Sequence, residues 1–346
     1  MLPKQALYRA ELRPEQSESI AEQSQRGTRD FRTQVSITSP QPQKRDNAGM
    51  DDNICTISEL RSYPIKSCGG QLANEALLIE TGFELDRAWM VVDDTSRFIT
   101  QREHPRMALI STVVKTDDLI VSAPGMQKLY VPIGEAGPGV TVSVWDDTVS
   151  AFDMGDLAAQ WFSDFVNEDP ARVGAKGKFR LVRFDPNFER KSDPKWAGEN
   201  SFAVSQFSDG YAVLIASQAS LDLLNSRLAT QGQHAVTMDR FRPNIVLSGI
   251  EAHEEDLLDT ITVETDDGLV TLKLCKPCAR CPIPNIDPLT AISHPAVSDA
   301  LQQYRQNPVL DGAITFGMNA YVVRVDNQAI NYTLRVGQRV RTALKF

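Results

Sequence analysis

Three of the chain's five cysteines fall at intervals of three residues in "CKPCARCP", residues 275–282. Thiols in such patterns hold zinc, hold iron–sulfur clusters, form disulfides or act singly as thiolates. Zinc needs about four nitrogen or sulfur ligands. Here Cys55 and Cys68 lie far upstream, and the four histidines show no ligand spacing. A ferredoxin-type cluster motif would need an adjoining fourth cysteine, which this segment lacks.

The sequence alone leaves three other interpretations of these three cysteines open. A disulfide between Cys275 and Cys278, or between Cys278 and Cys281, is allowed by spacing, although no thioredoxin-like βαβ pattern surrounds it. A single working thiolate is a second option, and Arg280 beside Cys281 would favour its deprotonated form. Buried structural cysteines are the plain alternative.

Several other segments carry groups that bind anions. "YPIKSCGG" offers Lys66, the Ser67 hydroxyl and glycine-exposed backbone N–H groups, which can hold a phosphate without being a P-loop. "DRAW" embeds Arg87 among strand residues, which predicts a buried partner. "RFRPNIV" predicts that Arg242 and Asn244 point the same way from a strand. Together these segments predict an electropositive pocket for an anionic ligand.

Two further polar features have plain explanations. Asp209 in "FSDGYAVL" is a lone carboxylate before an apolar run, which is more typical of a turn former than of an acid catalyst. The connection over residues 166–200 carries a basic cluster, which we interpret mainly as a solvated face. Its members are Lys176, Lys178, Arg180, Arg183, Arg190, Lys191 and Lys195.

Composition limits the class of protein. The 346 residues are 42% hydrophobic and 23% charged, which is ordinary for a globular protein of two domains. A net charge of −9 and a pI near 5.1 argue against a general nucleic-acid binder. No run approaches the ~18 apolar residues of a membrane span. The N-terminus lacks the apolar core of a secretory signal, and its glutamates weigh against a transit peptide. We therefore expect a cytoplasmic protein without a membrane span.

The elements that must position these residues are mainly strands. Residues 1–52 are polar and lack a sustained period, which predicts a disordered tail, with Met50 as an alternative start. From residue 54 onward, short β-branched runs separated by Asp, Gly and Pro predict a barrel or sandwich. "VVKTDDLIVS", "VSVWDDTVSAF" and "TITVETDDGLVTLKL" are typical of hairpins. We expect domains at 53–170 and 171–346.

Two segments are typical of helices. In "MGDLAAQWFSDFV", Leu157, Trp161 and Phe165 recur at four-residue steps, which predicts one buried stripe. "SQASLDLLNSRLATQG" predicts a helix capped at its N-terminus by Ser217 or Ser220. The fold class is therefore mainly β with α.

The order of these segments resembles that of the MOSC proteins, specifically of an N-terminal MOSC β-barrel domain followed by a catalytic MOSC domain. In particular, it resembles that of the mitochondrial amidoxime-reducing components and their bacterial counterparts. The resemblance covers roughly residues 54–346 and rests on seven segments in register. They are "YPIKSCGG", "DRAWMVVD", "FITQREHPRMALI", "FSDGYAVLIASQASLDLLN", "RFRPNIVLSG", "ARCPIPNIDPLTA" and "LRVGQRV".

This resemblance implies a cofactor, molybdenum bound to one pyranopterin dithiolene, and a cysteine ligand to the metal, which is Cys281 by its place in the motif. Cys275 and Cys278 lie outside the matched position and are implied to be bystanders or groups that surround the ligands of the metal. Asp209 matches an acidic residue close to the metal and is implied to be a proton donor or hydrogen-bond anchor. The implied pterin and phosphate contacts are Lys66, Ser67, Arg87, Arg242, Asn244 and Arg280.

The implied activity is the two-electron reduction of N-hydroxylated compounds such as amidoximes, hydroxylamines and N-hydroxylated nucleobases. Detoxification of mutagenic base analogues is the implied role. Electrons would come from a separate ferredoxin, flavodoxin or cytochrome b5-type protein with its reductase. MOSC proteins are also associated with pyridoxal phosphate binding. The alternative function is that of a sulfur carrier or a handler of molybdenum cofactor, with Cys281 as a persulfide or thiolate. A β-rich binding module with buried cysteines is the third reading.

Overall fold

The computed structural model describes residues 53–168, 176–199, 201–324 and 329–345. The expected disordered tail over residues 1–52 and the expected domain boundary near residue 170 lie outside these described residues. The expectation of a mainly β fold with a barrel core is confirmed, because strands predominate and one sheet closes on itself.

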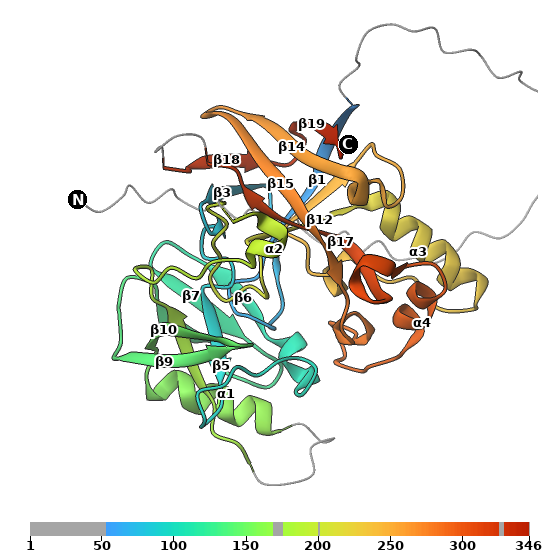
Figure 1. Cartoon of the computed structure of the whole chain (residues 1–346). Helices are drawn as coiled ribbons and strands as arrows, with labels where there is room; N and C mark the ends of the chain where they lie inside the picture. The colour runs from blue at the N-terminus through green and yellow to red at the C-terminus, as the bar shows by residue number, and fades with distance from the viewer. Residues whose placement is uncertain (1–52, 169–175, 200, 325–328, 346) are drawn as a thin grey trace, which may run out of the picture. The chain divides into compact units, whose positions relative to one another are not determined.

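Seven of the described strands form the closed barrel (Figure 1). In spatial order they are β12 (Val213–Ser217), β13 (Ile245–Ser248), β1 (Asn53–Ser62), β19 (Arg339–Leu344), β14 (Leu258–Thr265), β15 (Gly268–Ala279) and β17 (Ala313–Val322). β12 and β13 pair in parallel, and β17 closes the barrel by pairing antiparallel with β12. Closure leaves these strands without open edges. Alternating apolar side chains such as Leu247, Ile261 and Leu272 fill the interior.

Short strands extend the barrel at its rim. β2 (Gln71–Ala73) pairs with β1, and β16 (Gln306–Asn307) pairs with β17. A separate sheet is formed by β18 (Tyr332–Arg335), β3 (Glu75–Ile79) and β4 (Gly82–Phe83). Strands from both ends of the chain therefore build this part of the molecule.

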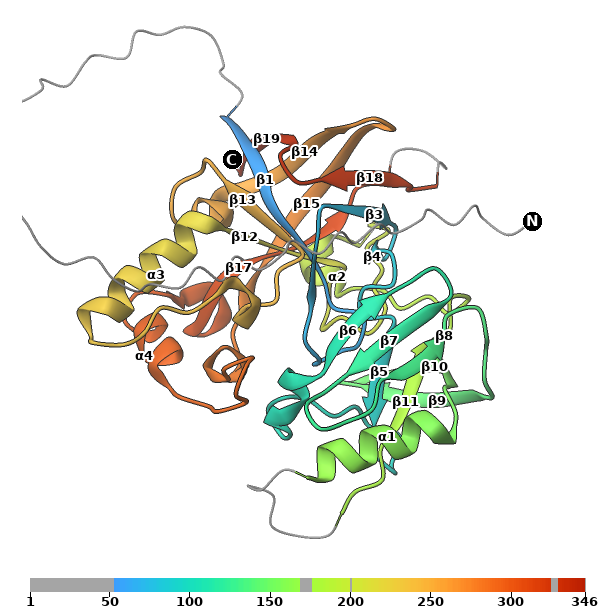
Figure 2. The ribbon, with the colours of Figure 1, turned by 180° about the vertical axis from the view of Figure 1, so that it is seen from behind.

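The remaining strands form two sheets around a second core, seen below the barrel in Figures 1 and 2. One contains β5 (Trp89–Val92), β11 (Arg180–Phe184), β10 (Asp147–Asp153) and β9 (Gly139–Val144). The other contains β6 (Ser111–Val114), β7 (Asp118–Ser122) and β8 (Leu129–Pro132). Helix α1 (Asp156–Asn167) packs its aromatic residues into this second core. The three predicted hairpins are confirmed as β6–β7, β9–β10 and β14–β15.

The predicted stripe of α1 is partly wrong. Trp161 and Phe165 are buried, as expected, but Leu157 is 76% exposed. Steps of four residues rotate by about 40° in a helix of 3.6 residues per turn, so Leu157 and Phe165 lie about 80° apart around the axis. The buried face instead takes in Ala158 and Phe162.

The other helices flank the barrel. α3 (Gln218–Thr230) and α4 (Ala296–Gln302) lie beside each other on one side of it in both views (Figures 1 and 2), and α2 (Pro194–Ala197) is a single turn. Ser217 caps α3 by accepting a hydrogen bond from the Ser220 N–H, which confirms the first of the two predicted caps. Short 3-10 turns cover Pro105–Leu109, Met238–Arg240, Glu254–Leu257, Ile283–Asn285 and Pro308–Leu310. No helix among the described residues is long and apolar enough to cross a membrane.

Candidate active site

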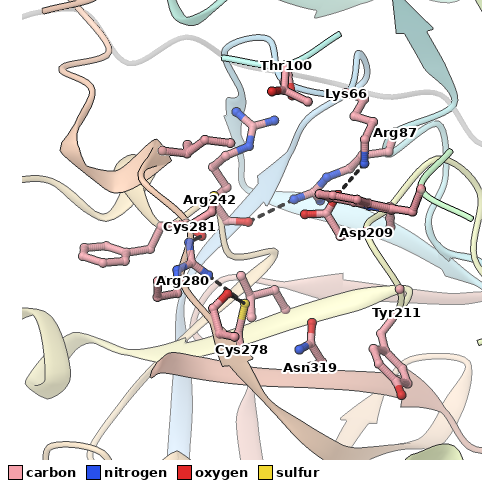
Figure 3. Close-up of a pocket in the computed structure, with 18 of the residues that line it drawn as sticks. Lys66, Arg87, Thr100, Asp209, Tyr211, Arg242, Cys278, Arg280, Cys281 and Asn319 are labelled. Carbon is pink, nitrogen blue, oxygen red and sulfur yellow. Dashed lines mark hydrogen bonds and ion pairs between the residues drawn. The ribbon is translucent and has the colours of Figure 1, made fainter. Parts of the chain in front are cut away.

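A cavity of about 290 Å³ is lined by side chains from both parts of the fold (Figure 3). Most come from the loop after β1, the residues on either side of β5, the turn between β9 and β10, the loop before β12, the residues before β13, and the end of β15 with the residues after it; β17 adds Asn319. Every residue that the sequence singled out for a site lies in this lining. These are Lys66, Ser67, Arg87, Asp209, Arg242, Asn244, Arg280 and Cys281.

Lys66 and Asp209 form a charged pair in the lining (Figure 3). The Lys66 ammonium donates to Asp209 Oδ1 at 2.5 Å and to the Phe207 carbonyl at 2.8 Å. The Lys66 side chain is 6% exposed, whereas that of Asp209 is 76% exposed. Burial lowers the pKa of Lys66, against the opposing effect of Asp209. Asp209 is open to the cavity but otherwise enclosed by protein atoms, and this loss of solvation would raise its pKa; the Lys66 ammonium and a hydrogen bond from the Trp145 indole nevertheless hold that pKa well below its ordinary value. Asp209 is therefore an anion at neutral pH.

Arg87 is fixed by buried partners. Its Nη1 donates to the Asp86 carboxylate and, at 3.0 Å, to Asn244 Oδ1, and its Nη2 donates to the Arg242 carbonyl at 3.0 Å. Asp86 is buried, so the buried partner predicted for Arg87 is confirmed. The guanidinium is thus held at the lining with a set orientation.

Asn244 is 1% exposed and uses all of its hydrogen-bonding positions within the protein. Its Nδ2 donates to the Arg61 carbonyl at 3.2 Å and to Asp86 Oδ2 at 3.0 Å. Its Oδ1 accepts from Arg87 at 3.0 Å and from the Leu214 N–H at 3.1 Å. The structure therefore gives Asn244 the task of holding Arg87 and joining two barrel strands.

Arg242 and Arg87 both stack on one tyrosine ring. The Tyr63 ring lies 4.4 Å from the Arg87 guanidinium and 4.3 Å from that of Arg242. Arg242 donates to the Cys68 carbonyl at 2.5 Å. Burial, together with the positive charge of Arg87, lowers the pKa of Arg242. The expectation that Arg242 and Asn244 share one face of a strand is wrong, because β13 begins only at Ile245 and Arg242 has a left-handed backbone.

Left-handed backbone conformations gather at the cavity. Ser67, Arg87, Trp145 and Arg242 have φ values of 64°, 50°, 55° and 57°, and all four line it. Such conformations cost non-glycine residues about 1–3 kcal/mol each and persist where the surrounding structure holds them. Their concentration here indicates that side-chain placement at this cavity is maintained against backbone strain.

Two β-bulges bring one of the cysteines into the lining. The pairing of β15 with β17 shifts register at Cys275 and again at Cys278, and such bulges re-aim side chains. Cys278 lines the cavity together with Cys281, which follows the strand end. Cys275 instead donates to the Asn319 carbonyl at 3.4 Å. Of the two roles implied for Cys278, its place in the cavity wall is consistent with a group near the metal's ligand and not with a bystander.

The other three thiols lie outside the lining of the cavity. Burial raises the pKa of Cys55 to about 11 and that of Cys68 and Cys275 to about 12. Thiols held in the neutral form are poor nucleophiles and poor metal ligands. All five cysteines are free thiols in the structure. The chemistry of the cavity therefore rests on Cys278 and Cys281.

Arg280 contacts a different cysteine from the one expected. Its Nη1 donates to Cys278 Sγ at 2.8 Å and its Nη2 to the Phe241 carbonyl at 2.7 Å (Figure 3). The positive charge that the sequence placed beside Cys281 thus lies against Cys278. The Arg280 Nε is buried without a hydrogen-bond partner among the described residues, and buried polar atoms are ordinarily satisfied.

Sequence reasoning missed two residues of the cavity mouth. Trp145, 46% exposed, donates from its indole to Asp209 Oδ1 at 3.3 Å. The Arg102 guanidinium lies 4.6 Å from the centre of that indole. The sequence around Trp145 predicts only a hairpin. The signal that could have pointed to the cavity is the aromatic side chain at the hairpin turn.

The residues present fit a phosphate-bearing group that carries a soft metal. The cavity is surrounded by cationic side chains and has one carboxylate in its lining, that of Asp209. The cationic side chains include Lys66, Arg87, Arg242 and Arg280. The unpartnered Arg280 Nε offers a further donor. Thiolates suit soft and redox metals. Among the described residues, no group of three or more His, Cys, Asp or Glu side chains is placed to hold a metal ion.

Comparison with known proteins agrees with the resemblance to MOSC proteins. Residues 54–169 match the model of the MOSC N-terminal beta barrel domain, and residues 203–341 match that of the MOSC domain. Mitochondrial amidoxime reducing component 2 of Bos taurus is 34% identical over 260 residues, covering 73% of each chain. Mitochondrial amidoxime-reducing component 1 of Homo sapiens is 33% identical over 262 residues, again covering 73% of each chain.

Among solved structures, the YUAD protein of Bacillus subtilis aligns with 84% of this chain and 97% of its own, at 9% identity and a TM-score of 0.32. That score is too low to support any conclusion. The two domain matches and the identity to the curated relatives are sufficient to assign the family of this chain. This chain belongs to the family of MOSC-domain proteins that includes the mitochondrial amidoxime-reducing components.

Proposed function

We propose that this chain is a molybdenum-cofactor-dependent reductase of N-hydroxylated compounds. The observation that carries the proposal is the composition of one cavity, in which two thiols, five cations and one ionised carboxylate converge. An excess of buried positive charge favours an anionic ligand. The names of the curated relatives, amidoxime-reducing components, supply the reaction class.

The cofactor would be held by side chains already in place. Cys281 would hold the metal through Sγ, and Lys66, Ser67 and Arg87 would hold the phosphate. Within the described part of the chain, Arg242 donates to one carbonyl, so most of its N–H groups would be available to the acceptor atoms of the pterin. Arg280 would add its Nε. Asn244 contributes by fixing the guanidinium of Arg87.

When bound, the molybdenum group would supply two electrons for the reaction R–NH–OH + 2e⁻ + 2H⁺ → R–NH₂ + H₂O. The protein supplies orientation and protons. Because its carboxyl is ionised, Asp209 accepts a hydrogen bond from a substrate N–H or O–H. The Lys66 ammonium donates a hydrogen bond to Asp209, which keeps this carboxylate ionised and fixes its orientation.

The finer features of this function are part of the proposal. The substrates would be amidoximes, hydroxylamines and N-hydroxylated nucleobases, and reduction of such compounds would serve detoxification. Electrons would come from a separate ferredoxin, flavodoxin or cytochrome b5-type protein with its reductase. A cytoplasmic location stays a prediction, since the curated relatives carry mitochondrial names. Nothing among the described residues or the relatives' names supports pyridoxal phosphate binding.

The test is metal and pterin analysis of protein purified from a host that makes the cofactor. Wild type is compared with Cys281→Ala and with Cys275→Ala, whose thiol lies outside the lining. Reduction of a small amidoxime with a reduced viologen dye removes the need for the physiological donor. We expect near-stoichiometric molybdenum and turnover in wild type and Cys275→Ala, and loss of turnover in Cys281→Ala.

Other outcomes would separate the alternatives. Molybdenum and pterin bound without any turnover would favour a handler of the cofactor. A persulfide on Cys281, detected by mass spectrometry in protein without molybdenum, would favour the sulfur carrier. Neither metal nor persulfide would leave a binding module and would overturn the proposal.

A further inference from the structure

Arg190 lies just behind the cavity and holds the loop that carries Asp209. It is 6% exposed and does not itself line the cavity. Its Nη1 donates to the carbonyls of Ser208 at 2.5 Å and Gln206 at 2.8 Å, and its Nη2 donates to the carbonyl of Asp209 at 3.3 Å. One guanidinium therefore ties together three carbonyls along the segment that ends in Asp209.

The same guanidinium also holds the hairpin that carries Trp145. Arg190 Nε donates to Asp147 Oδ2 at 2.7 Å, and Asp147 begins β10 two residues after Trp145. Trp145 in turn donates to Asp209 Oδ1. The interpretation of the basic cluster as a solvated face is therefore wrong for Arg190, although it holds for its neighbour Lys191, whose side chain is 77% exposed.

We propose that Arg190 is a positioning residue that fixes Asp209 and Trp145 relative to each other at the mouth of the cavity. It acts on Asp209 through the backbone of the loop and on Trp145 through the Asp147 carboxylate. Its effect on turnover rests on the proposed reductase function, whereas its effect on the loop does not.

Arginine is suited to this place for a geometric reason. Its planar fork presents five N–H donors in fixed directions, so it reaches three carbonyls and a carboxylate at once. A lysine of similar length keeps the charge but offers a single nitrogen. Methionine keeps the apolar stem and removes every donor, which leaves the carbonyls of the loop without their partner. The restraint on Asp209 should therefore weaken from wild type to Arg190→Lys and again to Arg190→Met.

The experiment compares Arg190→Lys and Arg190→Met with Lys191→Gln, an adjacent change on the exposed face. Hydrogen exchange read by mass spectrometry reports the opening of residues 206–212. Metal analysis and steady-state reduction of an amidoxime with a reduced viologen dye report the site. We expect Arg190→Met to speed exchange in residues 206–212 at least tenfold. Its kcat should fall about tenfold, with molybdenum content unchanged and with exchange in β14, β15 and β19 unchanged. Arg190→Lys should fall between Arg190→Met and wild type, and Lys191→Gln should match wild type.

Each outcome bears on the proposal. Equal exchange in residues 206–212 for Arg190→Met and wild type would overturn it. Faster exchange spread over β14, β15 and β19 would show a merely structural role and would also overturn it. If wild type contains no molybdenum and shows no turnover, the proposed function fails, while the exchange data still decide whether Arg190 holds the loop.

Discussion

Replacing Asn244 with alanine tests how far the cavity wall depends on one buried amide. The side chain makes four hydrogen bonds, with Arg87, Asp86, the Arg61 carbonyl and the Leu214 N–H, at 3.0 to 3.2 Å. At about 1 kcal/mol for each buried hydrogen bond, Asn244→Ala should lower the free energy of unfolding by about 4 kcal/mol. It should also free Arg87 from its fixed orientation, so the holoprotein should lose phosphate-bearing cofactor on dialysis.

The assay is urea unfolding followed by far-UV circular dichroism, with the stability change taken from the shift in midpoint at a common slope. Asn319→Ala is the matched control, because Asn319 also lines the cavity but its amide donates to the Lys276 carbonyl alone among the described residues. We expect that control to lose about 1 kcal/mol.

Equal midpoints for Asn244→Ala and Asn319→Ala would refute the reasoning, since they would mean that the four partners of Asn244 find replacements. A loss of about 4 kcal/mol with full retention of cofactor would refute only the link from Asn244 to Arg87. The two readouts therefore separate the role in stability from the role in the site.

Three further predictions concern the fold. Burial and two nearby guanidinium groups lower the pKa of His253 from 6.5 to about 4. Between those pH values the unfolded chain binds a proton that the folded chain does not. The free energy of unfolding should therefore fall as pH drops from 6.5 towards 4, by about 2 kcal/mol after discounting for the partial exposure of the ring. His253→Asn, which tolerates the left-handed backbone found there, should show a flatter decline in urea midpoints over this range, and an unchanged slope would exclude His253 as its source. Gly317→Ala should cost about 2 kcal/mol more than Gly312→Ala in urea unfolding. Both glycines have a positive φ, but only the first would place Cβ against a backbone oxygen, that of Ile215 at 2.7 Å; equal losses would show that the barrel absorbs the clash. Leu157→Lys should change the free energy of unfolding by no more than about 0.5 kcal/mol, because the side chain is exposed, and a loss above about 2 kcal/mol would restore the predicted stripe.

Local chemistry in the sequence determined the elements that are closed by near neighbours. The two Asp residues that follow Thr265, together with Gly268, fix a tight turn. The Ser217 hydroxyl accepts a hydrogen bond from the N–H three residues along the chain. Both features depend on chain conformation over a few residues, so no distant contact was needed to predict them. The buried partner of Arg87 was predictable for a related reason, since a charge next to an apolar strand is ordinarily paired; the structure places Arg87 just before β5, not within it.

The sequence also determined which residues gather at the cavity, through their types and through the order of their motifs. It did not determine what each one touches. The Arg280 guanidinium reaches Cys278 because a β-bulge in β15 turns that thiol inward, and the bulge exists only because β15 must pair with β17.

Tertiary structure alone decided the roles of Asn244 and Arg190. Asn244 spends all of its hydrogen bonds inside the wall because its partners arrive from β1, from the residues before β5 and from β12, which are remote in the chain. Arg190 sits in a basic, Pro-rich connection that reads as solvated surface, yet it is buried because the loop before Asp209 folds over it. The role of each side chain depends on which backbone carbonyls and amides have no other hydrogen-bond partner. Those groups come together only when the barrel closes.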